Sequence, residues 1–63
     1  MNRIREIRKA KGFTQTSLAV LAGISQPFLH DLETNRRGAK PDTLKRIADA
    51  LGVSVDELTE KAG

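Results

Sequence analysis

The residues of this chain best suited to chemistry lie in the stretch SQPFLHDLETNRRG, which runs from Ser25 to Gly38. It brings an amide, an imidazole, a carboxylate and two guanidinium groups close together in the sequence. These groups belong to Gln26, His30, Asp31, Arg36 and Arg37. Such donors and acceptors contact the base edges and phosphates of nucleic acids. A segment that only filled a core would not need them, so the stretch predicts a binding surface.

Other kinds of chemistry are excluded or disfavoured by the composition. The 63-residue chain has no cysteine and one histidine, so disulfides, thiolate metal sites and histidine-rich metal sites are not possible. It shows no phosphate-loop spacing and no convincing Ser/His/Asp set, and a domain of this length is too small for a sizeable pocket. We therefore expect no enzymatic activity, no cofactor and no small-molecule ligand.

The uneven distribution of charge suits a polyanionic partner that binds to one side of the molecule only. The formal net charge is +3, with basic residues crowded into the first eleven positions and into the segment 36–40. Acidic residues gather towards the C-terminus, at Asp49, Asp56, Glu57 and Glu60. Such asymmetry indicates a polyanion, although charge alone favours an ordinary solvated surface. No apolar run approaches the roughly 20 residues of a membrane span, so we expect no membrane partner and a cytoplasmic location.

The elements that position this stretch are predicted to be helices. Thr14 caps one helix, which Gly23 ends. Ser25 caps the next helix, with Pro27 in its first turn, where a missing N–H has little cost. The turn between them, residues 22–25, is short and contains glycine, which fits both a helix-turn-helix and an ordinary corner between two helices. The residues expected on the two inner faces are Leu18, Leu21, Ala22, Leu29 and Leu32.

Helical spacing predicts three further helices, so we expect a compact all-α bundle of five short helices. The first of them ends at Gly12. The fourth, TLKRIADAL, begins at an Asp42 cap after a loop over residues 35–41. Ser54, three residues before a glutamate, has capping-box spacing and begins the fifth. The expected core consists of Ile4, Ile7, Leu18, Ile24, Leu29, Leu32, Leu44, Ile47, Leu51, Val53 and Leu58.

Two segments, TQTSLAVLAGISQPFLHDLE and KPDTLKRIADALGVSVDEL, together resemble the helix-turn-helix domain of the phage repressor and Cro family. The likeness runs from about Ile4 to Leu58. Its most specific elements are Gln15, Leu18-Ala19, Gly23, the Leu29…Leu32-Glu33 run and the segment IADALGVS. The resemblance implies that residues 1–63 form one lambda-repressor-like DNA-binding domain, with the helix-turn-helix at about residues 15–33 and the third helix in the major groove.

The resemblance implies base contacts from the outward face of the third helix. The expected contacts are Gln26, Pro27, Phe28, His30 and Asp31. The Gln26 amide offers the donor and acceptor that match N7 and N6 of adenine. Pro27 stands where the family often has a polar residue, so it can make only an apolar contact. His30 is expected to be a polar residue of this face rather than a pH switch.

Two of these residues have alternative roles. Phe28 either lies at the edge of the core or contacts a thymine methyl group. Asp31 either accepts from cytosine N4 or pairs with Arg36 or Arg37 to hold the loop. The sequence leaves both alternatives open.

Phosphate contacts are expected on both sides of this face. The positive end of the second helix, with Gln15 beside it, is a natural anchor for a phosphate. The polar and basic segment after the third helix can reach a backbone strand. The expected contacts are Gln15, Thr34, Asn35, Arg36, Arg37 and Lys40. They would position the domain without distinguishing sequences.

Two further roles follow from the resemblance alone. Arg8 and Glu33 match an arginine and a glutamate that form an ion pair in related repressors, so we interpret them as structural. The fifth helix and the turn before it match a dimer surface. In this chain that surface consists of Val53, Val55, Glu57 and Leu58.

The sequence thus favours a sequence-specific regulator of transcription that binds double-stranded DNA. We expect a repressor that binds a near-palindromic operator as a homodimer, at least on DNA. The alternative is a protein-interaction module with the same fold, such as an antitoxin, whose surface would consist of Val20, Leu21 and the acidic C-terminal face. Antitoxins often carry a tail that wraps the toxin, and none follows Gly63, so we expect DNA binding.

Overall fold

The computed structural model describes residues 3–59 and places them in five helices, with no strand among them. The helices are α1 (Ile4–Ala10), α2 (Gln15–Ala22), α3 (Gln26–Glu33), α4 (Pro41–Leu51) and α5 (Val55–Thr59). The expected all-α architecture is confirmed. Within residues 3–59, no helix has the length and apolarity needed to cross a membrane, and no cluster of acidic and histidine side chains could hold a metal ion. Positions 1–2 and 60–63, the ends of the expected domain, lie outside the described residues.

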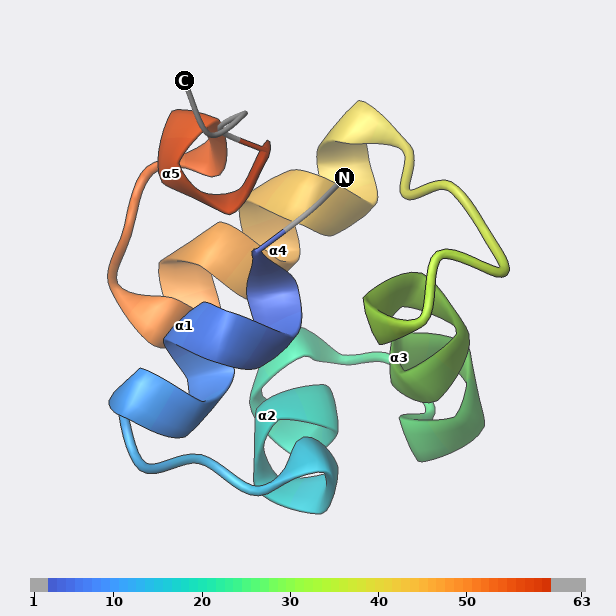
Figure 1. The fold of residues 1–63 in the computed structure, drawn as a ribbon, viewed down its shortest axis with the longest axis horizontal. Helices are drawn as coiled ribbons and strands as arrows, with labels where there is room; N and C mark the ends of the chain where they lie inside the picture. The colour runs from blue at the N-terminus through green and yellow to red at the C-terminus, as the bar shows by residue number, and fades with distance from the viewer. Residues whose placement is uncertain (1–2, 60–63) are drawn as a thin grey trace.

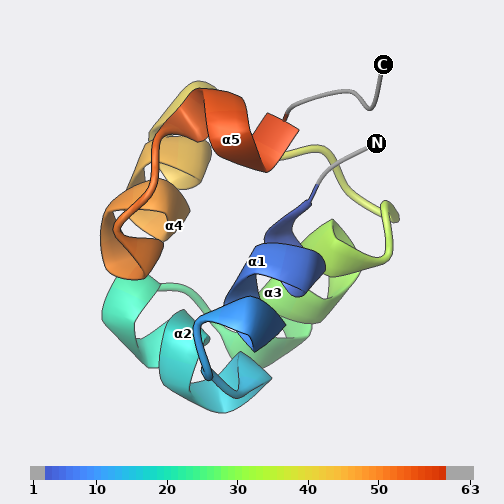
Figure 2. The ribbon, with the colours of Figure 1, turned by 60° about the vertical axis from the view of Figure 1, so that its left-hand side comes forward.

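The helices enclose one core and leave α3 at the edge of the bundle. α2 packs against α3 and α4, α4 packs against α5, and α1 contacts α3 and α5. Figure 1 shows α3 at the right-hand edge, with α1 and α2 on its inner side. In the turned view of Figure 2, α1, α2, α4 and α5 surround the centre, and α3 lies behind α1. α3 therefore has one side towards the core and another towards solvent.

The capping residues expected for the two helices that flank the turn are confirmed. The Thr14 hydroxyl accepts the backbone N–H of Ser17, and the Ser17 hydroxyl accepts that of Thr14, each at 3.0 Å. Gly23 ends α2 with a φ of 72°, a left-handed conformation that glycine adopts at little cost. Ser25 then accepts the N–H of Phe28 at 3.2 Å and begins α3. These local bonds fix the direction in which α3 leaves the turn.

Two expectations about the helices are wrong. Asp42 does not cap α4, because the helix begins at Pro41, with Lys40 in the cap position and no side-chain hydrogen bond. The fixed φ of proline suits the first position of a helix, so the expected loop ends one residue early. Leu21 is predicted to face inward but is 60% exposed. The second half of α2, LAVLA, is apolar at every position, so spacing alone does not identify its inner face.

The buried apolar residues form one aliphatic core. Its members are Ile4, Ile7, Leu18, Ala19, Ala22, Leu29, Leu32, Ile47, Ala48, Leu51 and Leu58. Ile24, Leu44 and Val53, which we expected among them, are only partly buried and pack against this core. Leu29 and Leu32 are 0% and 1% exposed, so they hold the inner side of α3 in place.

A matched pair of substitutions on α2 tests which side of this helix is buried. Leu18→Ala removes a side chain with 0% exposure and leaves a cavity, which should lower the free energy of unfolding by about 2–5 kcal/mol. Val20→Ala, at a side chain with 74% exposure, should change it by less than about 0.5 kcal/mol. Urea denaturation followed by circular dichroism measures both. Equal losses for the two variants would contradict this placement of α2.

Candidate nucleic-acid interface

A buried ion pair ties α1 to the end of α3. Arg8 Nε donates to Glu33 Oε2 at 2.6 Å, and Arg8 Nη2 donates to Glu33 Oε1 at 3.1 Å, so the contact is bidentate. Arg8 Nη1 donates to the Phe13 carbonyl at 2.9 Å. The two side chains are only 9% and 1% exposed, and no buried side-chain polar atom of the described residues lacks a partner. The structure thus brings together the two residues that the resemblance implies as a structural pair.

Gln15 extends this pair towards the surface. Its Nε2 donates to Glu33 Oε1 at 3.1 Å and lies 3.3 Å from His30 Nδ1. Its Oε1 accepts a hydrogen bond from Gln26 Nε2. The first residue of α2 therefore connects the buried carboxylate with two residues on the outward side of α3. The side-chain amide of Gln15 is engaged by protein groups, and its contact with a phosphate stays a prediction.

The family resemblance implied the ion pair of Arg8 and Glu33, whereas the contacts of Gln15 with α3 were not predicted from the sequence. A signal for them is present in the sequence, because Gln26, His30 and Glu33 recur at intervals of four and three residues along α3. Residues at that spacing lie on one side of a helix. A long polar side chain at the start of α2 reaches all three, because α2 packs against α3.

The five predicted base contacts lie in two environments. Gln26, Pro27 and His30 are exposed, and the structure brings Gln26 and His30 together through their common partner. Phe28 and Asp31 are half-buried. The exposed residues offer both polar and apolar groups along one side of α3, and which of them touch a base stays a prediction.

Arg37 folds back towards α3 and contacts the two half-buried residues. Its Nε lies 3.5 Å from Asp31 Oδ2, and its guanidinium carbon lies 5.8 Å from the centre of the Phe28 ring. The backbone carbonyl of Asp31 also accepts the N–H of Arg36 at 2.9 Å, after Asn35 has turned the chain with a φ of 62°. The structure therefore supports a loop-holding role for Asp31, with Arg37 as its partner. Because the Arg37 side chain is 63% exposed, this pair orients a side chain more than it stabilises the fold.

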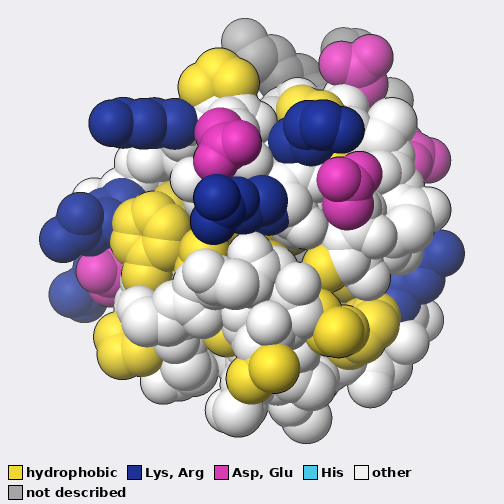
Figure 3. All heavy atoms as spheres, turned by 180° about the vertical axis from the view of Figure 1, so that it is seen from behind, with side chains coloured by type: hydrophobic (Ala, Val, Ile, Leu, Met, Phe, Trp, Pro, Cys, Tyr) yellow, Lys and Arg dark blue, Asp and Glu magenta, His cyan; other side chains and the backbone are white. Residues whose placement is uncertain are grey.

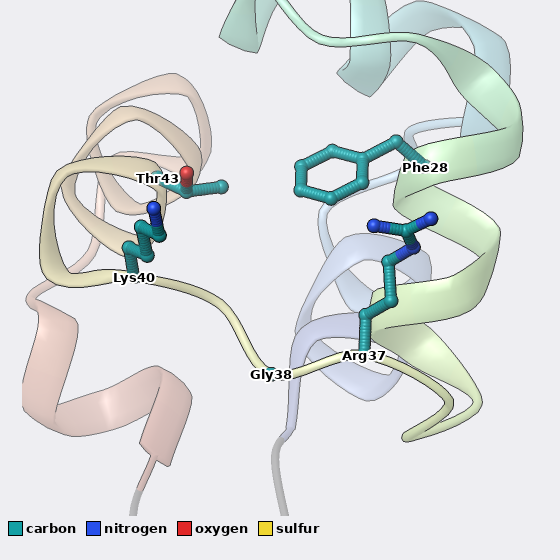
Figure 4. A pocket seen from close by; sticks show the side chains of 5 residues that line it. All are labelled: Phe28, Arg37, Gly38, Lys40 and Thr43. Carbon is teal, nitrogen blue, oxygen red and sulfur yellow. The ribbon is translucent and has the colours of Figure 1, made fainter.

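An open hollow lies between this segment and the start of α4. It has a volume of about 520 Å³ and is lined by Phe28, Arg37, Gly38, Lys40 and Thr43. Figure 4 shows the Phe28 ring and the Arg37 guanidinium on the α3 side, opposite Lys40 and Thr43 on the α4 side. Two cations thus border a space beside α3, an arrangement suited to a negatively charged strand that passes along the surface.

The cations on α4 are paired with carboxylates of the same helix, whereas two of the cations after α3 are not paired within the described residues. The exposed pairs on α4 are Lys45–Asp49 and Arg46–Asp42, at 3.7 and 3.3 Å. Basic and acidic side chains alternate over α4 in the view from behind (Figure 3). By contrast, the side chains of Arg36 and Lys40 make no hydrogen bond or ion pair within the described part of the chain. Thr34 and Asn35 are exposed beside them, and the Thr34 hydroxyl donates to the carbonyl of His30 at 3.0 Å.

The expected dimer surface needs one correction. Val53 and Val55 are half-buried, and Glu57 is exposed, with its carboxylate accepting the N–H of Ser54 at 2.8 Å. Leu58, however, is 0% exposed, so its assignment to a surface is wrong. α5 is so short that its one large apolar side chain is needed in the core.

Comparison with known proteins identifies the family. Residues 4–58 match a family model described as helix-turn-helix. The chain belongs to the helix-turn-helix family. The immunity repressor of Bacillus phage phi105 is 39% identical over 56 residues, which cover 89% of this chain and 39% of that protein. The regulator DdrOP3 of Deinococcus deserti is 38% identical over 58 residues, which cover 92% of this chain and 45% of that protein.

Solved structures of this family share the fold. The restriction-modification controller protein C.AhdI of Aeromonas hydrophila matches with a TM-score of 0.85 at 33% identity, over 87% of this chain and 83% of that chain. The N-terminal DNA-binding domain of SinR from Bacillus subtilis also matches with a TM-score of 0.85 at 33% identity, over 97% of this chain and 91% of that chain. These matches confirm the five-helix helix-turn-helix fold and the resemblance to phage repressors. The chain spans less than half the length of several curated relatives, such as 44% of the Bacillus subtilis regulator RghRB.

Breaking the buried ion pair from one side should be strongly destabilising. Glu33→Ala leaves Arg8 buried without its partner and should lower the free energy of unfolding by about 3–5 kcal/mol. The double variant Arg8→Met/Glu33→Leu replaces both charges by apolar groups and should recover part of that loss. Asp49→Asn, which breaks an exposed pair on α4, is the control, with an expected change below about 1 kcal/mol. Denaturation in urea measures all three, and a loss in Glu33→Ala as small as in the control would contradict the structural role of the pair.

Proposed function

We propose that this protein is a transcriptional repressor that binds double-stranded operator DNA through the outward side of α3, in the cytoplasm of a prokaryotic cell. The observation that carries the proposal is the exposed polar side of α3, followed directly by Arg36 and Lys40, whose side chains pair with no other group within residues 3–59. Helix-turn-helix proteins place such a helix in the major groove, with phosphate contacts on both sides. The relatives support this function, since one is named an immunity repressor and another a DNA-binding domain.

Gln26 is the residue best placed to contact a base edge. One of its amide N–H groups is donated to Gln15, which leaves the other N–H and the lone pairs of its Oε1 for DNA. A donor beside an acceptor matches N7 and N6 of adenine in the major groove. Because Gln15 is in turn held by the buried Glu33, the Gln26 amide is oriented before DNA binds.

Phosphate contacts would come mainly from the segment between α3 and α4. Arg36 and Lys40 are exposed, and within residues 3–59 their side chains pair with no other group, so each offers a full charge to a DNA strand. Arg37 lies closer to α3, where Asp31 offsets part of its charge. The remaining contacts that we propose are Thr34, Asn35 and the N-terminus of α2 at Gln15, whose side-chain amide is already engaged by protein groups. Together they would set the register of α3 in the groove.

The proposal includes the pairing of two copies on the operator. One module makes few base contacts, and a second copy on a half-site one helical turn away doubles them. We assign this contact to Val53, Val55 and Glu57, where partly exposed apolar groups lie beside a carboxylate. An operator with near two-fold symmetry would match such a pair.

A second candidate function is the docking of a protein partner, such as a toxin, on α2. The observation that favours it is the exposure of Val20 and Leu21, at 74% and 60%. Single exposed apolar residues are nevertheless common on soluble domains. DNA binding is therefore the stronger proposal.

Selection of bound duplexes from a random library tests the proposed function. At about physiological salt, sequencing of the bound fraction should reveal a motif with two-fold symmetry and half-sites about one turn, or roughly 10 base pairs, apart. A single half-site would keep DNA recognition but contradict pairing. Salt-sensitive binding without any enriched sequence would contradict operator recognition, and the search for a protein partner would then come first.

Two substitutions should separate base recognition from phosphate contact. Gln26→Ala should weaken binding to the selected site by about 1–3 kcal/mol and relax the preference at one position. Arg36→Ala should weaken binding to all sequences and lower the slope of log K against log salt by about one unit. Lys45→Ala is the control, since Lys45 pairs with Asp49 on α4 and its loss should leave both properties unchanged. Fluorescence anisotropy titrations over a range of salt concentrations measure these effects, and equal behaviour of the first two variants would contradict the division of roles.

A further inference from the structure

The contacts of Gln15 fix the orientation of its side-chain amide. Its Oε1 accepts from Gln26 Nε2, and its Nε2 lies 3.1 Å from Glu33 Oε1. As the partner of the Arg8 guanidinium, the Glu33 carboxylate accepts hydrogen bonds and donates none. The reverse orientation of the amide would place its oxygen against this carboxylate. Nε2, with its two N–H groups, must therefore lie on the side of Glu33.

This orientation determines which nitrogen of His30 carries the proton. His30 Nδ1 lies 3.3 Å from Gln15 Nε2, which has donors only. One N–H of Gln15 is given to Glu33, and the second is available to His30. Nδ1 can then only accept, which places the proton of the neutral imidazole on Nε2. The His30 side chain is exposed, and Nε2 has no hydrogen-bond partner within residues 3–59.

We propose that His30 is a further specificity-determining residue, which Gln15 holds in the Nε2–H form so that it donates a hydrogen bond to a guanine in the major groove. The inference rests on the proposed function. His30 lies one turn after Gln26, and the same amide of Gln15 contacts both, so the two residues share one side of α3. The contact with Gln15 thus selects the neutral tautomer of His30 in which Nε2 donates.

Guanine is the base that fits a lone donor best. Its major-groove edge presents two acceptors, N7 and O6. Adenine N7 lies beside the N6 amino group, thymine O4 lies beside a methyl group, and cytosine presents a donor. Guanine is therefore the only base that offers a single N–H its acceptors without a neighbouring donor or methyl group on the same base.

The position of the proton can be measured without DNA. His30 is the only histidine of the chain, so a two-bond ¹H–¹⁵N correlation spectrum of the protein without a histidine tag shows one imidazole. At about pH 8, where an ordinary histidine is neutral, we expect the proton on Nε2 and none on Nδ1. In Gln15→Ala, which removes the partner and keeps His30, we expect a mixture of the two forms. A proton on Nδ1 in the unmodified protein, or the same ratio of forms in both proteins, overturns the inference.

Recognition of guanine is tested with modified duplexes. In the selected site, each guanine is replaced in turn by 7-deazaguanine, which has a C–H group in place of N7. One replacement should weaken binding of the unmodified protein by roughly three- to tenfold, the usual effect of one hydrogen bond. The same replacement should leave binding by His30→Ala unchanged. Asp49→Asn, a control on α4, should respond like the unmodified protein.

The outcomes distinguish this inference from the proposed function. If a motif is selected but every replacement weakens the unmodified protein and His30→Ala equally, His30 does not contact guanine and the inference fails, while the proposed function stands. If His30→Ala weakens binding to all duplexes alike, His30 contacts a phosphate and the inference also fails. If no motif is selected, the proposed function fails, and the guanine contact fails with it.

Discussion

Burying an arginine and a glutamate together constrains the whole of a domain as small as this one. Neither Arg8 nor Glu33 can lose its partner without leaving an unpaired charge away from water, so α1 and the end of α3 must stay in contact. The remaining polar atoms of the pair are also satisfied, by the Phe13 carbonyl and the Gln15 amide. An apolar contact of the same size would tolerate a shift of one helix along the other. The bidentate pair does not, and we interpret it as the device that sets the register of α3.

The same carboxylate carries this constraint from the core to the surface. Glu33 orients the Gln15 amide, and Gln15 in turn contacts Gln26 and His30 on the outward side of α3. The proposed binding surface is therefore organised by a buried charge. The loop after α3 is held differently, because Arg37 rests on exposed contacts that water and salt can weaken. We expect the polar side of α3 to be ordered before binding, and the cations of the loop to adapt to the DNA backbone.

The features that the sequence predicted well are those decided within a few residues. The caps at Thr14 and Ser25 and the turn at Gly23 depend on local hydrogen bonds, and all three are confirmed. Leu21 and Leu58 were misplaced because burial depends on which helices meet, and a short apolar helix does not reveal its inner side. The outward side of α3 followed from helical spacing, since Leu29 and Leu32 mark its inner side.

The orientation of side chains on that surface did not follow, because it depends on contacts between helices. Gln15 meets His30 across 15 positions of sequence. The spacing of Gln26, His30 and Glu33 places these three on one side of α3, but it does not show that Gln15 reaches them. The partner of Asp31 depended on the path of the loop after Asn35, whose left-handed φ of 62° the sequence did not indicate. The family resemblance supplied the pair of Arg8 and Glu33, which spacing alone would not have found.

We expect DNA to contact the surface that Glu33 organises. Titration of ¹⁵N-labelled protein with a short duplex that carries the selected site, followed by NMR, would show which residues meet the duplex. The largest shifts should fall on the side-chain amides of Gln15 and Gln26, the imidazole of His30 and the backbone of residues 34–40. Shifts concentrated instead around Val20 and Leu21, with the Gln26 amide unchanged, would mean that DNA does not bind to the outward side of α3.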